Sequence, residues 1–211
     1  MGLTTQIGVY GGSFDPPHQA HVALAQAAID QLALDELRIF PTGHAWHKSR
    51  PLSPAADRLA MARLAFAPLA RVRVDERELQ RAGPTYTVDT LEALRAEFPT
   101  AQLYLVIGAD QVAALTSWHR WADIAGLATI CAAQRASPLP DPRSLQSGAA
   151  APAEAAVPTR TIQFPLMPIS ATDIRRRVAQ GRDITDLVPP DVARYIATHH
   201  LYRNLDDPDQ P

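Results

Sequence analysis

The chain lacks several features that mark whole classes of protein. Its 211 residues contain one cysteine, Cys131, so an internal disulfide is excluded. Cys131 ends the largely apolar run 127–131, which favours the role of a small core residue. No basic and then apolar signal segment opens the chain, and no apolar run approaches the roughly 20 residues needed to cross a bilayer. We therefore expect a cytoplasmic protein without a membrane partner.

Two further absences concern charge and phosphate-binding patterns. The formal net charge of −2 gives no general reason to expect nucleic acid as a partner, so an anion site would have to be local. The Gly-x-Gly-x-x-Gly pattern does not occur, which counts against a dinucleotide-binding dehydrogenase. The Gly-Lys-Ser/Thr of a P-loop is absent as well, which counts against a P-loop enzyme.

The most informative segment that is present runs from residue 7 to residue 21. Its apolar start, Ile7 to Tyr10, is typical of a buried parallel strand. Gly11 and Gly12 follow directly, and glycines there let main-chain N–H groups come close to a ligand. This order of strand and glycine turn predicts a ligand site at the end of the strand.

The second half of the same segment predicts a helix start. Asp15, Pro16 and Pro17 are expected to begin the helix, because proline is favoured in a first helical turn. His18 and His21 are then three residues apart on one face. Each feature alone is common, but main-chain donors, a helix dipole and two imidazoles together favour a polyphosphate ligand.

Short apolar runs alternate with amphipathic segments along the rest of the chain. This alternation predicts a doubly wound, Rossmann-like parallel sheet with helices on both faces, in an α/β fold of one domain spanning residues 1–211. The expected strands are 7–10, 37–40, 72–74, 103–107, 128–131 and 161–164. The expected helices are 18–32, 54–66, 88–98, 171–180 and one that starts at Pro190. Residues 136–160, rich in proline, alanine and serine, lack either periodicity and are expected to form a flexible insertion.

Residues of capping type mark two of these helices. Ser53 and Pro54 are placed as the N-cap and first residue of the second helix. Ser170 and Asp173 have the spacing of a capping box, and Gly181 is placed to stop the same helix.

Four further groups of residues follow expected strands, where open α/β sheets bind ligands. The loop 41–48 carries His44, His47 and Lys48, which suit a phosphate or an ordinary solvated loop. The charged segment 75–78 leads to Thr87, which either holds a carboxylate with N–H groups at a helix start or simply caps that helix.

The other two groups lie later in the chain. Asp110 follows what should be a central strand and suits ribose hydroxyls, and Trp118 and Trp121 suit either a base or the core. Residues 169–177 place hydroxyls at a helix start with Arg175 one turn in, which predicts a second anion site.

Two of these motifs carry a specific resemblance. They are Gly11-Gly12-Ser13-Phe14-Asp15-Pro16-x-His18-x-x-His21 and Ile169-Ser170-Ala171-Thr172-x-Ile174-Arg175, which resemble the two signatures of the nucleotidyltransferase superfamily. Within it, the chain is similar to bacterial nicotinate-nucleotide adenylyltransferases through Asp75-Glu76-Arg77-Glu78-Leu79, Pro84-x-Tyr86-Thr87-x-x-Thr90-Leu91, Gly108-x-Asp110 and Trp118. The resemblance covers residues 7 to 203 and implies that AMP passes from ATP, accompanied by Mg²⁺, to nicotinate mononucleotide, which releases pyrophosphate.

The resemblance also implies roles for single residues. The catalytic set, on the ATP phosphates, would be His18, His21 and Arg175. The other ATP-binding residues would be Gly11, Gly12, Ser13, Phe14, Ser170 and Thr172. The mononucleotide would contact Thr87, Asp110, Trp118, His119, His47 and Lys48, with Trp118 stacked on the pyridine ring.

Two positions depart from the family pattern, and three rival functions stay open. Ala20 stands where glycine is frequent, and His44-Ala45-Trp46 replaces the usual prolines before His47. A pantetheine-phosphate adenylyltransferase would share both signatures but would not need Trp118. A zinc hydrolase could use the histidines but has no use for the glycine turn. A nucleotide-binding module without turnover is the third alternative.

Overall fold

The computed structural model describes residues 4–43, 51–135 and 159–203. The predicted contacts of His44, His47 and Lys48, and nearly all of the expected insertion at 136–160, lie outside these residues. Within the described ranges, no helix combines the length and the apolar character that a membrane span requires.

Six parallel strands form one sheet in the order β3-β2-β1-β4-β5-β6. Their bounds are β1 (Gln6–Gly12), β2 (Glu36–Pro41), β3 (Val72–Val74), β4 (Gln102–Gly108), β5 (Thr129–Arg135) and β6 (Thr159–Phe164). The order reverses between β1 and β4, which are direct neighbours although some 90 residues separate them. Ligands of doubly wound folds bind at this reversal, beyond the carboxyl ends of the strands.

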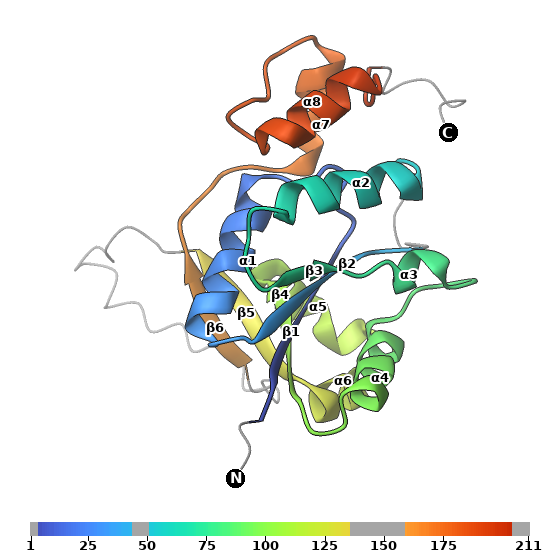
Figure 1. Cartoon of the computed structure of the whole chain (residues 1–211), viewed down its shortest axis with the longest axis vertical. Coiled ribbons are helices and arrows are strands. Elements are labelled where there is room, and N and C mark those ends of the chain that lie inside the picture. The colour runs from blue at the N-terminus through green and yellow to red at the C-terminus, as the bar shows by residue number, and fades with distance from the viewer. Residues whose placement is uncertain (1–3, 44–50, 136–158, 204–211) are drawn as a thin grey trace, which may run out of the picture.

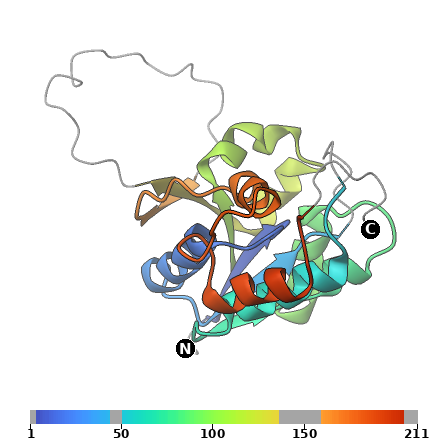
Figure 2. The same cartoon turned by 90° about the horizontal axis from the view of Figure 1, so that it is seen from above.

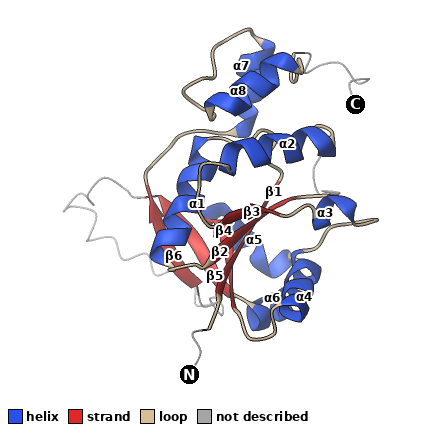
Figure 3. Ribbon diagram, viewed as in Figure 1, coloured by secondary structure: helices blue, strands red, loops and turns tan. Residues whose placement is uncertain are grey.

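Helices cover both faces of the sheet (Figure 1). They are α1 (Gln19–Gln31), α2 (Ala55–Phe66), α3 (Arg77–Gln80), α4 (Thr87–Glu97), α5 (Ala109–Ala114), α6 (Trp121–Leu127), α7 (Ala171–Ala179) and α8 (Pro190–Thr198), with a 3-10 turn, η1, at Leu115–Ser117. In Figure 2, α8 lies along α2 and α7 lies beside α8. The layered arrangement of blue helices on a red sheet is clearest in Figure 3.

Side chains of alternating direction along the strands divide the core in two. Tyr10 and Ile39 face the cluster that includes α1, α2, α7 and α8. Val9 and Phe40 face the cluster that includes α4, η1 and α6. The period of two in a strand requires this alternation, and it confirms the prediction of helices on both faces.

The starts of α1, α2 and α4 differ by one residue from the prediction, and in α1 and α2 the difference concerns the cap. The first helix begins at Gln19, and His18 is its N-cap in extended conformation, so Pro16 and Pro17 precede the helix. In α2 the N-cap is Pro54 and no side chain caps the helix, so the prediction of Ser53 as the cap was wrong. The Ser53 N–H instead donates to Asp15, a partner remote in sequence.

The two ends of α7 follow the prediction more closely. The Ser170 Oγ accepts from the Asp173 N–H at 3.1 Å, which confirms the cap of α7. Gly181 has φ +66, a backbone conformation that glycine adopts without strain. Three short helices, α3, α5 and α6, were not predicted, because four to seven residues are too few to show a helical period.

Candidate active site

The two histidines of the first signature form one unit at the start of α1. Their rings stack with centroids 3.6 Å apart, although His18 is the N-cap and His21 lies in the first turn. The His18 N–H donates to the His21 Nδ1 at 3.1 Å. The Phe14 ring packs edge-on against the His21 ring at 5.2 Å. The orientation of His21 is therefore held by the main chain on one side and by an aromatic ring on the other.

The bond to His18 decides the tautomer of His21. Because the Nδ1 accepts a hydrogen bond, a neutral His21 ring carries its proton on Nε2. His21 is thus a donor through Nε2, which suits a phosphate oxygen.

Both imidazoles are neutral near pH 7. Burial lowers the pKa of His18 to about 4. Burial, and secondarily the neighbouring His18, lowers the pKa of His21 well below its ordinary value. The His18 Nδ1 is buried and has no hydrogen-bond partner among the described residues. Formal positive charge at this site must therefore come from another residue.

The second signature brings a guanidinium against the turn that precedes α1. The Arg175 Nη1 donates to the main-chain oxygen of Asp15 at 2.6 Å, and its Nη2 donates to the Thr172 Oγ1 at 3.1 Å. The start of α7 is thereby fixed against the turn that precedes α1. The two anion-binding segments predicted separately are brought together, with Ser170 and Thr172 exposed beside Arg175.

The two arginines that follow are engaged differently. Arg177 donates to the Asp173 Oδ2 at 2.8 Å, and Arg176 pairs with the other oxygen of the same carboxylate. Both pairs lie on α7 itself, so these two arginines are engaged within their own helix.

The glycine turn presents main chain to this site. Gly11 is exposed, and a Cβ built there meets no atom within 4 Å. A Cβ at Gly12 would instead touch the Phe14 ring at 3.0–3.2 Å. Phe14 itself is buried at φ +47, and its ring packs on Tyr10 and Phe66. Phe14 therefore contributes to the turn through its main chain, while its ring belongs to the core.

The described residues that are expected to bind the mononucleotide lie on α4, on α5 and in the segment after η1. Thr87 is the first residue of α4 and Tyr86 is its N-cap, so capping by the Thr87 side chain does not occur. The rings of Tyr86 and His119 lie 4.3 Å apart, and this contact joins the start of α4 to the segment after η1. Trp118 and Tyr86 pack on the same core cluster. Asp110 lies in the first turn of α5, directly after β4.

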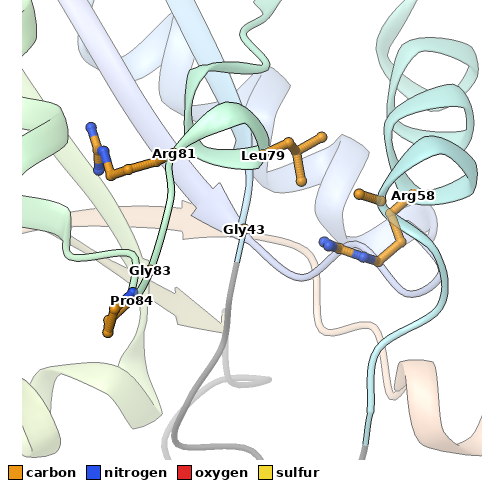
Figure 4. A pocket seen from close by; sticks show the side chains of 7 residues that line it. Gly43, Arg58, Leu79, Arg81, Gly83 and Pro84 are labelled. Carbon is orange, nitrogen blue, oxygen red and sulfur yellow. The ribbon is translucent and has the colours of Figure 1, made fainter.

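A cavity of about 420 Å³ lies beyond the carboxyl end of β2. Gly43, Ala55, Arg58, Leu79, Arg81, Gly83 and Pro84 line it. Figure 4 shows Arg58 reaching from α2 toward Gly43, with Leu79 and Arg81 on the opposite side. The cavity therefore lies between α2 and the segment that leads to α4, and Arg58, which lines it, also donates to the Ser13 carbonyl.

Sequence reasoning missed two residues that shape this region. Arg58 is buried and donates to the main-chain oxygens of Ser13, Thr42 and Ser53. A Cβ at Gly43 would lie 2.1 Å from the Glu78 carbonyl oxygen. An arginine in an amphipathic helix and a loop glycine carry no local signal of such contacts, because the partners come from other segments.

Glu78 is, like Arg58, a buried charged residue of this region, and its charge is costly. It is 6% exposed, and the Thr90 hydroxyl donates to its Oε1 at 2.8 Å. Burial raises the pKa of Glu78 to about 7, from an ordinary value of 4.5. A carboxyl group whose pKa is raised on folding lowers stability as the pH rises from about 4.5 through about 7.

Glu78→Gln is therefore expected to stabilise the protein at pH 8 and to change little at pH 4. The gain at pH 8 is about 3 kcal/mol, since one pKa unit corresponds to about 1.4 kcal/mol. Urea unfolding at both pH values measures it. Glu76→Gln, which alters a surface carboxylate paired with Arg63, is the control and should leave stability nearly unchanged. Equal effects of Glu78→Gln at pH 4 and pH 8 would contradict the expectation.

Comparisons with known proteins identify the family of this chain. Residues 9–177 match the model of the cytidylyltransferase-like family. A protein of Albidiferax ferrireducens named as a nicotinate-nucleotide adenylyltransferase is 54% identical over 94% of this chain and 98% of its own length. A protein of Chromobacterium violaceum with the same name is 41% identical over 95% of this chain and its full length.

The fold also has solved counterparts. The nicotinic acid mononucleotide adenylyltransferase of Plasmodium falciparum, in a complex with NaAD, superposes with a TM-score of 0.72 at 20% identity over 94% of this chain and 97% of its own. The identity at this level supports the fold, while the full-length relatives support the family. The chain therefore belongs to the cytidylyltransferase-like family and, within it, to the nicotinate-nucleotide adenylyltransferases.

Proposed function

We propose that this protein transfers AMP from ATP to nicotinate mononucleotide, forming nicotinate adenine dinucleotide and pyrophosphate in NAD biosynthesis. The observation that carries the proposal is the bond from Arg175 to the main-chain oxygen of Asp15. It joins two helix starts, one with two neutral imidazoles and one with a guanidinium, at a single place beside the glycine turn. Such a place suits a polyphosphate, because helix starts and cationic donors both favour anions.

The reaction demands little proton transfer. The nucleophile is an oxygen of the mononucleotide 5′-phosphate, which is already ionised at neutral pH because the second pKa of a phosphomonoester is about 6. A bond forms from this oxygen to the α-phosphorus of ATP, and the bond from that phosphorus to the β-phosphate oxygen breaks. The electron pair leaves with pyrophosphate. Catalysis therefore consists of in-line positioning and of stabilising charge on the departing phosphates.

We assign the residues of the site on this basis. His21 donates from Nε2 to a phosphate oxygen of ATP. His18, whose ring stacks on that of His21, contacts the ATP phosphates beside it. Arg175, with Ser170 and Thr172, faces the departing pyrophosphate. The remaining assignments are main-chain contacts at Gly11, Gly12, Ser13 and Phe14 for ATP, and contacts of Thr87, Asp110, Trp118, His119, His47 and Lys48 with the mononucleotide.

Magnesium enters, in this proposal, as part of the MgATP substrate. The described residues contain no group of three or more His, Cys, Asp or Glu side chains that could hold a metal ion. The Asp15 carboxylate is buried and engaged by Tyr202 and Ser53. Mg²⁺ commonly keeps several waters and binds through substrate phosphates, so a protein cage is not needed.

Two rival functions make different predictions. A pantetheine-phosphate adenylyltransferase would use the same phosphate site with another acceptor, and a binding module would show no turnover. The experiment is to incubate the protein with ATP, Mg²⁺ and one phosphate acceptor at a time, to measure pyrophosphate release, and to identify the product by mass. We expect release with nicotinate mononucleotide. Release only with phosphopantetheine, or none with any acceptor, would contradict the proposal.

The acceptor is further expected to be the acid rather than the amide. A carboxylate accepts hydrogen bonds on both oxygens, whereas the amide turns an NH₂ group toward one donor near Thr87 or His119. An unsatisfied buried donor costs about 1–3 kcal/mol, and a charge-assisted bond is lost with it. The kcat/KM for the acid should exceed that for the amide by roughly ten- to a hundredfold. A ratio near one would show that no carboxylate pocket exists here.

A further inference from the structure

A buried tyrosine near the end of the described chain is bonded to the phosphate-site turn. The Tyr202 hydroxyl donates to the Asp15 Oδ1 at 2.7 Å across 187 residues of sequence. Both side chains are buried, with 6% exposure for Tyr202 and 2% for Asp15. Burial raises the pKa of Tyr202 far above its ordinary value, so the hydroxyl keeps its proton and stays a donor. A neutral hydroxyl on a carboxylate makes a charge-assisted hydrogen bond, which is stronger than a neutral one.

Asp15 links this tyrosine to the arginine of the site. Its second carboxylate oxygen accepts from the Ser53 N–H at 3.3 Å, so both oxygens are engaged. Its main-chain oxygen accepts from the Arg175 Nη1 at 2.6 Å. With the side chain held by Tyr202 and Ser53, the carbonyl of the same residue has little freedom to turn. That carbonyl and the Thr172 hydroxyl both accept from the Arg175 guanidinium and so help to hold it in place.

Arg58 holds the other end of the turn in the same manner. Its Nη1 donates to the carbonyl oxygens of Ser13 at 3.1 Å and Thr42 at 2.7 Å, and its Nε donates to the Ser53 carbonyl at 2.9 Å. In a planar trans peptide the N–H points opposite to the C=O. The N–H groups after Ser13 and Thr42 therefore point away from Arg58.

We propose that Tyr202 is a positioning residue of the phosphate site, which acts through Asp15 on the guanidinium of Arg175. Tyr202 is too deeply buried to bind a substrate itself. The segment after α8 would then contribute to turnover as well as to stability. This inference rests on the proposed function for its kinetic readout.

A second tyrosine of the C-terminal region provides the matched control. The Tyr195 hydroxyl donates to the Asp57 Oδ1 at 2.8 Å, which joins α8 to α2. Within the described part of the chain, Asp57 makes no hydrogen bond to the glycine turn or to Arg175. Tyr195→Phe and Tyr202→Phe each remove one hydroxyl that donates to a carboxylate. Only Tyr202→Phe is expected to affect how the phosphates of the substrate are positioned.

The test is a double-mutant cycle of Tyr202→Phe with Arg175→Ala. Tyr202→Phe alone should lower kcat on the order of tenfold and leave the KM for nicotinate mononucleotide within about twofold, since the loss of one charge-assisted bond is expected to act on phosphate positioning. In the Arg175→Ala background it should cause no further loss of kcat. Tyr195→Phe should leave kcat unchanged in both backgrounds. Equal losses from Tyr202→Phe in both backgrounds, or a lowered Tm with unchanged kcat, would overturn the proposal.

A second measurement separates this inference from the proposed function. Calorimetry with inorganic tripolyphosphate follows the same cycle and needs no acceptor. The positioning role is supported if Tyr202→Phe weakens tripolyphosphate binding in the wild-type background but not in the Arg175→Ala background. This result would support it even if the wild-type protein did not turn over nicotinate mononucleotide. Should Tyr202→Phe not fold, Asp15→Asn keeps the size and an acceptor, and the same coupling with Arg175→Ala is expected. Independent effects of Asp15→Asn and Arg175→Ala would then refute the route through Asp15.

Discussion

His21→Ala is expected to lower kcat by about 10²- to 10³-fold, because one donor to the developing charge is lost. The Nε2–H of His21 is fixed by the bond at Nδ1 and by the Phe14 ring, so no reorganisation is needed as charge builds. A neutral donor adds little to the binding of ground-state ATP. The Kd for ATP, measured by calorimetry, should therefore change much less than kcat.

Two control variants separate the donor from the structure. His21→Asn keeps a side-chain acceptor within the first turn for the His18 N–H, so stability should recover while kcat stays low. His199→Ala removes an exposed imidazole that stacks on Tyr195 in α8, and it should leave kcat unchanged. A His21→Ala enzyme with near-normal kcat would remove His21 from the mechanism.

Gly43→Ala is the second substitution with a large expected effect, here on stability. The new Cβ would lie 2.1 Å from the Glu78 carbonyl oxygen and 2.7 Å from the Thr85 Oγ1. The nearer atom is main chain, which cannot swing aside as a flexible side chain can. Overpacking of this kind costs typically about 1–3 kcal/mol, measured as the free energy of unfolding in urea.

Gly11→Ala is its counterpart and is expected to weaken ATP binding while leaving stability nearly unchanged. The Cβ meets no atom within 4 Å, so the free energy of unfolding should change by no more than about 0.5 kcal/mol. The methyl group would occupy the open side of the turn where we place ATP. A clash worth about 1–3 kcal/mol corresponds to roughly ten- to a hundredfold weaker ATP binding. A stable Gly11→Ala protein with normal ATP affinity would show that the ligand does not approach this turn.

The strands and long helices were predictable because their signals are local. The prediction of 72–74 agrees with β3, and the other five strands were found with ends that differ by up to four residues. A buried parallel strand is a short apolar run, and a helix of nine or more residues is long enough to show its helical period. The three short helices escaped detection because they lack that length.

The sequence by itself determined the residue types of the site: glycines after a strand, two histidines three apart, and an arginine one turn into a capped helix. Only the tertiary structure decided that His18 precedes its helix, that the two rings stack, and that Arg175 reaches Asp15 across 160 residues. The tertiary structure alone also decided the roles of Tyr202, Arg58 and Gly43. Each depends on a partner from a distant segment, and such contacts form only when the open sheet and the helices packed on it bring those segments together.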